Sequence, residues 1–156
     1  MKGTDTNMTK GEARILALGD ICGKSGTQII EKKLWGIRKY CGADMVIANG
    51  ENASVGNGLD KETADRLFSS GVDVITGGNH TWKKSSVHSL LENNECVLRP
   101  ANYPAQCPGS GYCIFDMSSY RVLVINLLGT VFMESLESPF VVADKILERE
   151  KGKYDF

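Results

Sequence analysis

The 156-residue sequence predicts an α/β domain in which helices flank a largely parallel sheet. Three short apolar runs in the first half each end in a polar turn that contains glycine, and the segments between them carry apolar residues at helical spacing. This alternation favours right-handed crossovers between parallel strands. Because the apolar runs are nearly continuous, we expect the strands to be covered on both faces.

The predicted strands change character along the chain. The strands of the parallel sheet are expected at residues 14–18, 45–48 and 72–76, followed by a short strand at residues 96–98. Residues 111–117 and 120–128 then favour an antiparallel hairpin that turns at Ser118 and Ser119.

Helical spacing predicts two helices between the first three strands. In residues 27–40, one buried face is shared by Ile30, Leu34 and Ile37, whereas charged residues such as Arg38 point outward. Asp60 is the expected N-cap of the second helix, which ends at Gly71. The buried face of this second helix is predicted to consist of Ala64, Leu67 and Phe68.

Two further helices are expected in the second half. One covers residues 84–93 and buries Val87, Leu90 and Leu91. The other begins with Ser138 as a cap and Pro139 in the first turn. The buried stripe of this last helix is predicted to consist of Phe140, Ala143, Ile146 and Leu147. Residues 154–156 indicate the start of another strand.

Composition excludes several classes of protein. The 18 basic and 19 acidic residues give a net charge of -1, so we expect no stable nucleic-acid complex, which requires a basic face. No apolar run approaches the roughly 20 residues of a membrane span. Residues 1–13 are expected to form a flexible polar extension ahead of a domain at residues 14–156. With no export signal visible, the five cysteines predict free thiols in a cytoplasmic protein.

Polar side chains follow each of the first three predicted strands. Because the carboxyl ends of parallel strands meet at one edge of a sheet, we expect these side chains to converge. They are Asp20, Glu51, Asn52, Asn79 and His80. Two carboxylates, two amides and an imidazole form a set of donors that suits Mg²⁺, Mn²⁺, Fe or Zn²⁺.

Simpler interpretations exist for individual residues. An Asp or Asn after a strand often only makes a turn or caps a helix. His88, within a serine-rich stretch of a predicted helix, is expected to be solvated. Cys22 could be a nucleophile if Lys24 and a helix start lowered its pKa, but we expect it to be a small packing residue.

Four motifs occur in an order that resembles the YmdB-like metallophosphoesterases of the calcineurin-like superfamily. They are Gly-Asp-Ile-Cys-Gly-Lys at 19–24, Ala-Asn-Gly-Glu-Asn-Ala at 48–53, Gly-Asn-His-Thr-Trp at 78–82 and Arg-Pro-Ala-Asn-Tyr-Pro at 99–104. The resemblance covers residues 14–156. It implies the calcineurin-like fold, a sandwich of mixed, largely parallel sheets flanked by helices, with its C-terminal part missing.

The resemblance also implies roles at the site. Asp20 and Glu51 would be carboxylate ligands of two divalent metal ions (Fe, Mn, Mg or Zn), with Glu51 bridging both. Asn52 and Asn79 would be amide-oxygen ligands, and His80 would be the acid beside the leaving group. The expected substrates are small phosphodiesters, of which 2′,3′-cyclic nucleotides are the best-known class in this family.

The same resemblance predicts an incomplete catalyst. Family members continue past Phe156, and that further part supplies additional histidine ligands, so we expect a truncated chain that is incomplete or inactive by itself. A non-catalytic module that binds a nucleotide or a metal, and a truncated remnant, stay as alternatives. We also expect the apolar strand at 120–128, with Val122 and Val124, to lack a cover and to favour self-association.

Overall fold

The computed structural model describes residues 12–156, so the predicted extension at 1–13 falls almost wholly outside the described residues. A four-stranded sheet forms the centre of the domain, and all of its strands are parallel. In spatial and chain order these strands are β1 (Ile15–Leu18), β2 (Met45–Asn49), β3 (Val74–Thr76) and β4 (Val97–Leu98). The parallel sheet predicted from the apolar runs is therefore confirmed.

A two-stranded antiparallel hairpin forms a separate small sheet. It consists of β5 (Tyr112–Asp116) and β6 (Arg121–Ile125) and turns at Ser118, whose φ is 66°. The hairpin packs on one face of the four-stranded sheet, because Val122 and Val124 share a buried cluster with strand residues of that sheet. The hairpin is thus the second β layer of a sandwich.

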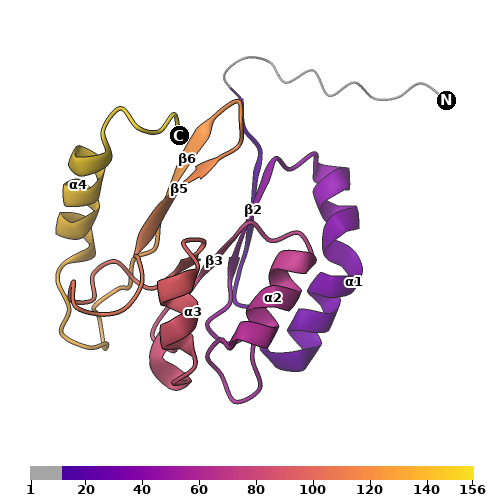
Figure 1. The fold of residues 1–156 in the computed structure, drawn as a ribbon, viewed down its shortest axis with the longest axis horizontal. Helices are drawn as coiled ribbons and strands as arrows, with labels where there is room; N and C mark the ends of the chain where they lie inside the picture. Colours follow the sequence, from indigo (N-terminus) through magenta and orange to yellow (C-terminus); the bar gives the residue numbers. More distant parts are fainter. Residues whose placement is uncertain (1–11) are drawn as a thin grey trace.

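Helices cover the two outer sides of this sandwich (Figure 1). On the parallel sheet lie α1 (Gly23–Cys41), α2 (Lys61–Ser69) and α3 (Val87–Asn93), with a short 3₁₀ turn, η1 (Thr81–Lys83), ahead of α3. Beyond the hairpin lies α4 (Pro139–Glu150), tied to β5 where the Tyr112 hydroxyl donates to Glu150 at 2.9 Å. The α/β fold class is therefore confirmed.

The alternation of side chains along each strand divides the core in two. Val46, Ala48 and Ile75 point toward the helices and pack with Leu34 of α1 and Leu67 of α2. The strand residues on the other face pack against the hairpin, and these are Met45, Val74 and Leu98. Strands buried on both faces explain why the sequence shows continuous apolar runs rather than an apolar–polar alternation.

The expectation that β6 is uncovered is wrong. Val122 is 3% exposed and Val124 7%, because both point into the cluster beneath the hairpin. The free edge of β6 is also occupied, since Leu123 N–H donates to the carbonyl of Phe156 at 2.8 Å and Asp155 N–H donates to Arg121 at 2.8 Å. The chain end thus pairs with β6, as the prediction of a strand start at 154–156 anticipated.

The buried stripe predicted for the last helix is confirmed at Ile146 but wrong at Phe140 and Leu147. The residues of α4 that are buried are Val142, Ile146 and Glu150, whereas Phe140 is 81% and Leu147 42% exposed. Apolar residues occur on both sides of this helix, so helical spacing alone does not select the face. The face that is buried carries Val142, Ile146 and Glu150, and the Glu150 carboxylate accepts from the Tyr112 hydroxyl and from Lys153.

Two residues of α1 depart from the predicted pattern. Ile37 is 41% exposed. Arg38 does not point outward but donates hydrogen bonds to the carbonyls of Ala43 and Asp44 and pairs with Asp73 at 2.9 Å. The guanidinium thereby ties the turn after α1 to the residues that precede β3.

The remaining helices agree with their predictions more closely. Asp60 caps α2 through a hydrogen bond from Thr63 N–H at 2.9 Å, and Ala64 and Leu67 are fully buried. The predicted inward residues of α3 are buried, although α3 begins only at Val87. No helix among residues 12–156 is long and apolar enough to span a membrane.

Candidate active site

The loops after β1, β2 and β3 meet at the carboxyl edge of the parallel sheet. Backbone hydrogen bonds join them: Ile21 N–H donates to Asn49 at 3.0 Å, and Gly23 N–H donates to Asn52 at 2.8 Å. Gly50 N–H donates to Thr76 at 2.9 Å. These bonds hold the three polar turns in contact, as the parallel order of the strands requires.

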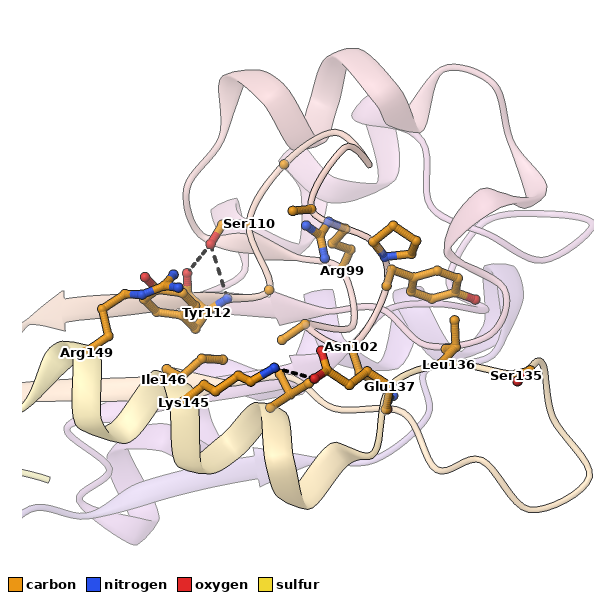
Figure 2. Close-up of a pocket in the computed structure, with 17 residues that line it drawn as sticks. Arg99, Asn102, Ser110, Tyr112, Ser135, Leu136, Glu137, Lys145, Ile146 and Arg149 are labelled. Atoms are coloured by element: carbon orange, nitrogen blue, oxygen red, sulfur yellow. Dashed lines mark hydrogen bonds and ion pairs between the residues drawn. The ribbon is translucent and has the colours of Figure 1, made fainter.

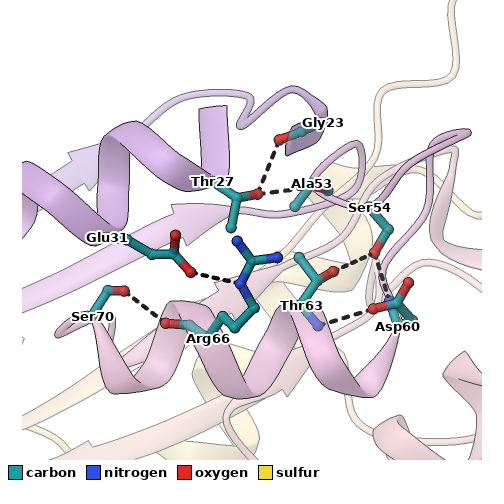
Figure 3. Close-up of polar contacts among 9 residues, drawn as sticks. All are labelled: Gly23, Thr27, Glu31, Ala53, Ser54, Asp60, Thr63, Arg66 and Ser70. Carbon is teal, nitrogen blue, oxygen red and sulfur yellow. Dashed lines mark hydrogen bonds and ion pairs between the residues drawn. The ribbon is translucent and has the colours of Figure 1, made fainter. Parts of the chain in front are cut away.

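Buried polar contacts between α1 and α2 anchor the loop after β2 (Figure 3). The Thr27 hydroxyl donates to the carbonyl of Ala53 at 3.2 Å, and the Ser54 hydroxyl donates to Thr63 at 3.0 Å. Ala53 is therefore fixed to α1 and Ser54 to α2, and both helices pack on the sheet. The neighbouring Glu51 and Asn52 gain a defined position from these contacts.

The side chains of Asp20, Asn52 and His80 form a continuous chain of hydrogen bonds. Asn52 Nδ2 donates to both carboxylate oxygens of Asp20, each at 3.0 Å. On its other side, Asn52 Oδ1 lies 2.5 Å from His80 Nδ1. Only this amide orientation pairs donors with acceptors, because a flipped Asn52 would turn its carbonyl oxygen toward a carboxylate.

The same geometry assigns the tautomer of His80. Since Asn52 Oδ1 only accepts hydrogen bonds, His80 Nδ1 must carry the proton that is donated to it. In the neutral ring the other nitrogen, Nε2, is then the one without a proton. His80 is half-buried and lines a cavity of about 310 Å³.

Glu51 is held against the loop that follows β3. Its Oε2 accepts a hydrogen bond from His80 N–H at 2.8 Å. A Cβ at Gly78 would lie 2.3 Å from Glu51 Oε1 and 2.4 Å from Oε2, which is far closer than any side chain allows. Glycine at 78 is therefore required for this close approach of a carboxylate to the backbone.

The predicted convergence is confirmed for four of the five residues by direct contacts. Asp20, Asn52, His80 and Glu51 form one hydrogen-bonded cluster. Asn79 is exposed and joins the others only as a lining residue of the cavity beside His80.

Further residues also line this cavity, among them Tyr103, Phe132 and Glu134, for which the sequence pattern predicts no role. Burial and the nearby Glu134 carboxylate raise the pKa of the Tyr103 hydroxyl. Phe132 is fully exposed and has a φ of 59°. Tyr103 lies in the motif at 99–104, but the approach of Tyr103 and Phe132 to His80 depends on loops far apart in the sequence.

The expectation for Cys22 is corrected. Cys22 is exposed rather than packed, and its thiol donates to Asp20 Oδ2 at 3.4 Å. That hydrogen bond to a carboxylate, together with desolvation and the negative charge, raises the pKa of Cys22. A thiolate nucleophile is therefore disfavoured, and the lowering influence expected from Lys24 does not prevail. His88 is exposed, as predicted, and its ring meets Trp82 edge-on at 5.7 Å.

The cluster offers oxygen atoms, which are the ligands that a hard divalent cation prefers. Carboxylate oxygens come from Asp20 and Glu51, and amide oxygens come from Asn52 and Asn79. Asn52 Oδ1 has a second lone pair, so the contact with His80 leaves it able to coordinate. Residues 12–156 contain no group of three His, Cys, Asp or Glu side chains arranged as a metal site. The described residues therefore offer a partial set of ligands.

Known proteins are similar to this chain in sequence and in fold. The family described as YmdB-like protein matches residues 16–156. A 2′,3′-cyclic-nucleotide 2′-phosphodiesterase of Bacillus subtilis is 35% identical over 134 residues, which is 86% of this chain and 51% of that protein. The chain thus spans about half the length of the curated relatives it matches.

Two solved structures have the same arrangement of elements. A hypothetical protein from Thermus thermophilus superposes with a TM-score of 0.83 at 40% identity, covering 88% of this chain and 54% of that one. A novel phosphatase from Mycoplasma pneumoniae superposes with a TM-score of 0.82 at 29% identity, covering 92% of this chain and 53% of that one. By the matched residues and by its fold, the chain belongs to the YmdB-like protein family.

Proposed function

We propose that the cluster at the sheet edge serves a metal-dependent phosphodiesterase that acts on small phosphodiesters, with 2′,3′-cyclic nucleotides as the substrate class. The observation that carries the proposal is the chain of hydrogen bonds from Asp20 through Asn52 to His80, with Glu51 held beside it. The relative from B. subtilis bears the name of such an activity and matches most of this chain.

In this proposal the side-chain oxygens of this chain would supply part of the ligands of two divalent ions, of Fe, Mn, Mg or Zn. Glu51 would be the carboxylate shared by both ions, and Asp20, Asn52 and Asn79 would each contribute an oxygen ligand. When bound, such ions would polarise the phosphoryl oxygens and lower the pKa of a bound water. Gly78 leaves room for the Glu51 carboxylate beside the backbone, and the hydrogen bond from His80 N–H holds the carboxylate there.

His80 is the proposed acid. Asn52 accepts from Nδ1, and Asp20 in turn orients the Asn52 amide, so the imidazolium form of His80 would donate its second proton from Nε2 in a fixed orientation. A 2′,3′-cyclic phosphodiester opens when one ribose oxygen leaves the phosphorus, and that oxygen needs a proton as the bond breaks. Donation from Nε2 supplies it, and general acid catalysis of this kind contributes roughly 10²–10⁴-fold in rate.

The metal-binding part is tested by titrating Mn²⁺ into the unmodified chain and into Glu51→Gln by calorimetry. We expect the affinity for Mn²⁺ to fall at least about tenfold in Glu51→Gln, because a charged ligand becomes a neutral amide. Glu92→Gln, which changes an exposed carboxylate on α3, is the matched control and should bind Mn²⁺ as the unmodified chain does. Equal affinity in Glu51→Gln and Glu92→Gln contradicts the bridging role.

The acid role is tested by hydrolysis of 2′,3′-cyclic AMP in the presence of Mn²⁺, with the chain extended to the full length of its relatives. His80→Ala should lower kcat by about 100-fold or more, while His88→Ala should leave it unchanged because His88 is exposed and lies on α3. Equal kcat values for the two variants contradict the role of His80. If the unmodified chain binds the nucleotide without hydrolysing it, the alternative of a non-catalytic nucleotide-binding module is favoured instead.

A further inference from the structure

A second, larger cavity lies between the loop that follows β4 and the helix α4 (Figure 2). Its volume is about 540 Å³, within the range of roughly 300–1,000 Å³ that is typical of small-molecule sites. It shares Tyr103 with the smaller cavity beside His80, but it contains none of the residues of the Asp20–His80 cluster. The proposed phosphodiesterase chemistry therefore does not account for it.

The cavity is lined by a buried arginine that has no counterion. Arg99 is only 6% exposed, and its backbone N–H donates to Ser110 at 3.0 Å. Its Nη1 donates to the carbonyl of Pro100 at 2.9 Å, whereas its Nε has no hydrogen-bond partner. Within residues 12–156 no carboxylate lies within ion-pair distance of Arg99.

Burial of the Arg99 guanidinium destabilises the fold unless an anion or an acceptor pairs with it. A buried donor without an acceptor costs roughly 1–3 kcal/mol, and a buried charge without a partner costs more. Burial lowers the pKa of Arg99, which is the direction expected of a cation removed from water with no anion beside it. Arg38 shows the contrast, because its guanidinium is satisfied by three backbone carbonyls and the Asp73 carboxylate.

Positive charge also dominates the rest of the cavity lining. Lys145 and Arg149 of α4 line it, and Glu137 is the only acidic residue among the lining residues. Glu137 is already paired with Lys145, as Figure 2 shows. Arg149 is exposed and forms no ion pair within the described part of the chain, so its guanidinium is available to an anion at the mouth of the cavity.

We propose that this cavity binds the oxyanion group, carboxylate or phosphate, of a small molecule between Arg99 and Arg149. The two guanidinium donors on the Nε side of Arg99, Nε and Nη2, form the parallel pair that grips such a group in bidentate fashion. Nη1 is the nitrogen already used by the protein. Because Nε is shielded from water, a small shift of the guanidinium toward the cavity accompanies binding.

The loop geometry supports a preformed site. Asn102 accepts from Leu128 N–H at 2.9 Å and donates to the carbonyls of Leu128 and Glu137, so the two walls of the cavity are joined. A Cβ at Gly111 would lie 2.2 Å from the Cα of Ala101, which shows how tightly the loop ends pack. The walls of the cavity are therefore fixed before the ligand binds, and the shift on binding is confined to the Arg99 guanidinium.

The test is a titration of the unmodified chain with inorganic phosphate, followed by backbone amide NMR. EDTA is present and no metal is added, so that the proposed metal site does not contribute. We expect saturable shifts at Ser110, Gly111 and Tyr112, and the same shifts in Glu51→Gln. Acetate in place of phosphate distinguishes a carboxylate site from a phosphate site, and sodium chloride at equal ionic strength controls for screening.

Variants at the cavity make the test specific. Arg149→Gln, an exposed position that should not disturb folding, is expected to weaken phosphate or acetate binding about tenfold. Lys151→Gln removes a charge next to the same helix end but outside the cavity, and should leave binding unchanged. Arg99→Lys keeps the positive charge but removes the parallel pair of N–H donors. It should also weaken the binding of phosphate or acetate.

Three results overturn the proposal. The first is the absence of saturable shifts with either anion. The second is equal binding by Arg149→Gln and Lys151→Gln. The third is an identical response to chloride, which shows screening rather than a site. None of these results bears on the Glu51 and His80 experiments, so the two proposals fail separately.

Discussion

The two faces of the parallel sheet are buried to different extents. On the helix side, β1 contributes Leu16 and Leu18 to a cluster that also holds Leu34 and Ile75. On the hairpin side, the cluster takes in β2, β3 and β4 but not β1, where Ile15 is 42% exposed and Ala17 is also exposed. Ile15 of β1 pairs in register with Met45 of the neighbouring β2, and Met45 is fully buried.

The difference shows that the hairpin covers only part of the sheet. Three helices follow three crossovers and therefore cover the helix side from β1 to β4. The hairpin is a single two-stranded unit, and its buried residues Val122 and Val124 reach Met45, Val74 and Leu98. We conclude that stability comes mainly from the helix side, and the following variants are ordered by the size of the effect that this conclusion predicts.

The largest effect is expected for Leu34→Ala. Leu34 of α1 is fully buried on the helix side, so its truncation loses apolar contacts and leaves a cavity. We expect the free energy of unfolding to fall by about 3 kcal/mol, measured by urea denaturation. A loss below about 1 kcal/mol would show that the helix side is not the main source of stability.

A smaller effect is expected for Val122→Ala in the hairpin. Val122 is 3% exposed, but fewer atoms are removed than from leucine, and the surrounding cluster is smaller. We expect a loss of about 1.5 kcal/mol in the same denaturation experiment. If Val122→Ala costs as much as Leu34→Ala, the two faces contribute equally and the comparison fails.

The capping carboxylate of α2 should make a pH-dependent contribution on the helix side. Burial acts to raise the pKa of Asp60, but hydrogen bonds from Thr63 and Ser54 and the charge of Lys84 outweigh it and lower the pKa below the ordinary 3.8. A folded-state pKa below the unfolded value means that the carboxylate stabilises the fold at pH above about 4. This contribution is lost as pH falls through the folded pKa.

Asp60→Asn tests this contribution because the amide can still cap the helix. We expect a cost of roughly 0.5 kcal/mol at pH 7 that disappears when the pH is lowered to about 3 or below. Thermal unfolding of both proteins between pH 7 and pH 2.5 measures the difference. A difference that stays constant over this range would assign the effect to hydrogen-bond geometry instead of charge.

The smallest effect is expected for Ile15→Thr. This substitution keeps the branched side chain that strands favour and changes a position that is 42% exposed on the uncovered part of β1. The free energy of unfolding should change by less than about 0.5 kcal/mol. A cost comparable with that of Val122→Ala would show that Ile15 is covered in solution, for example by a second copy of the chain, and size-exclusion chromatography would then reveal the dimer.

The candidate site was predictable because its residues follow strands directly. Asp20, Glu51, Asn52 and His80 are each placed by the end of an apolar run, and parallel order brings those ends together. The orientation of the Asn52 amide and the tautomer of His80 were not predictable, since they depend on contacts between three separate loops.

The sequence by itself determined the order of the elements, the parallel sheet and the edge at which the polar residues gather. These properties follow from local patterns: apolar runs, helical spacing and turn residues. Only the tertiary structure decided which face α4 buries, how Arg38 is used and that Arg99 lies beside a cavity without a counterion. The physical reason is that the partners of these side chains, or their absence, come from segments distant in the sequence, and no local pattern encodes them.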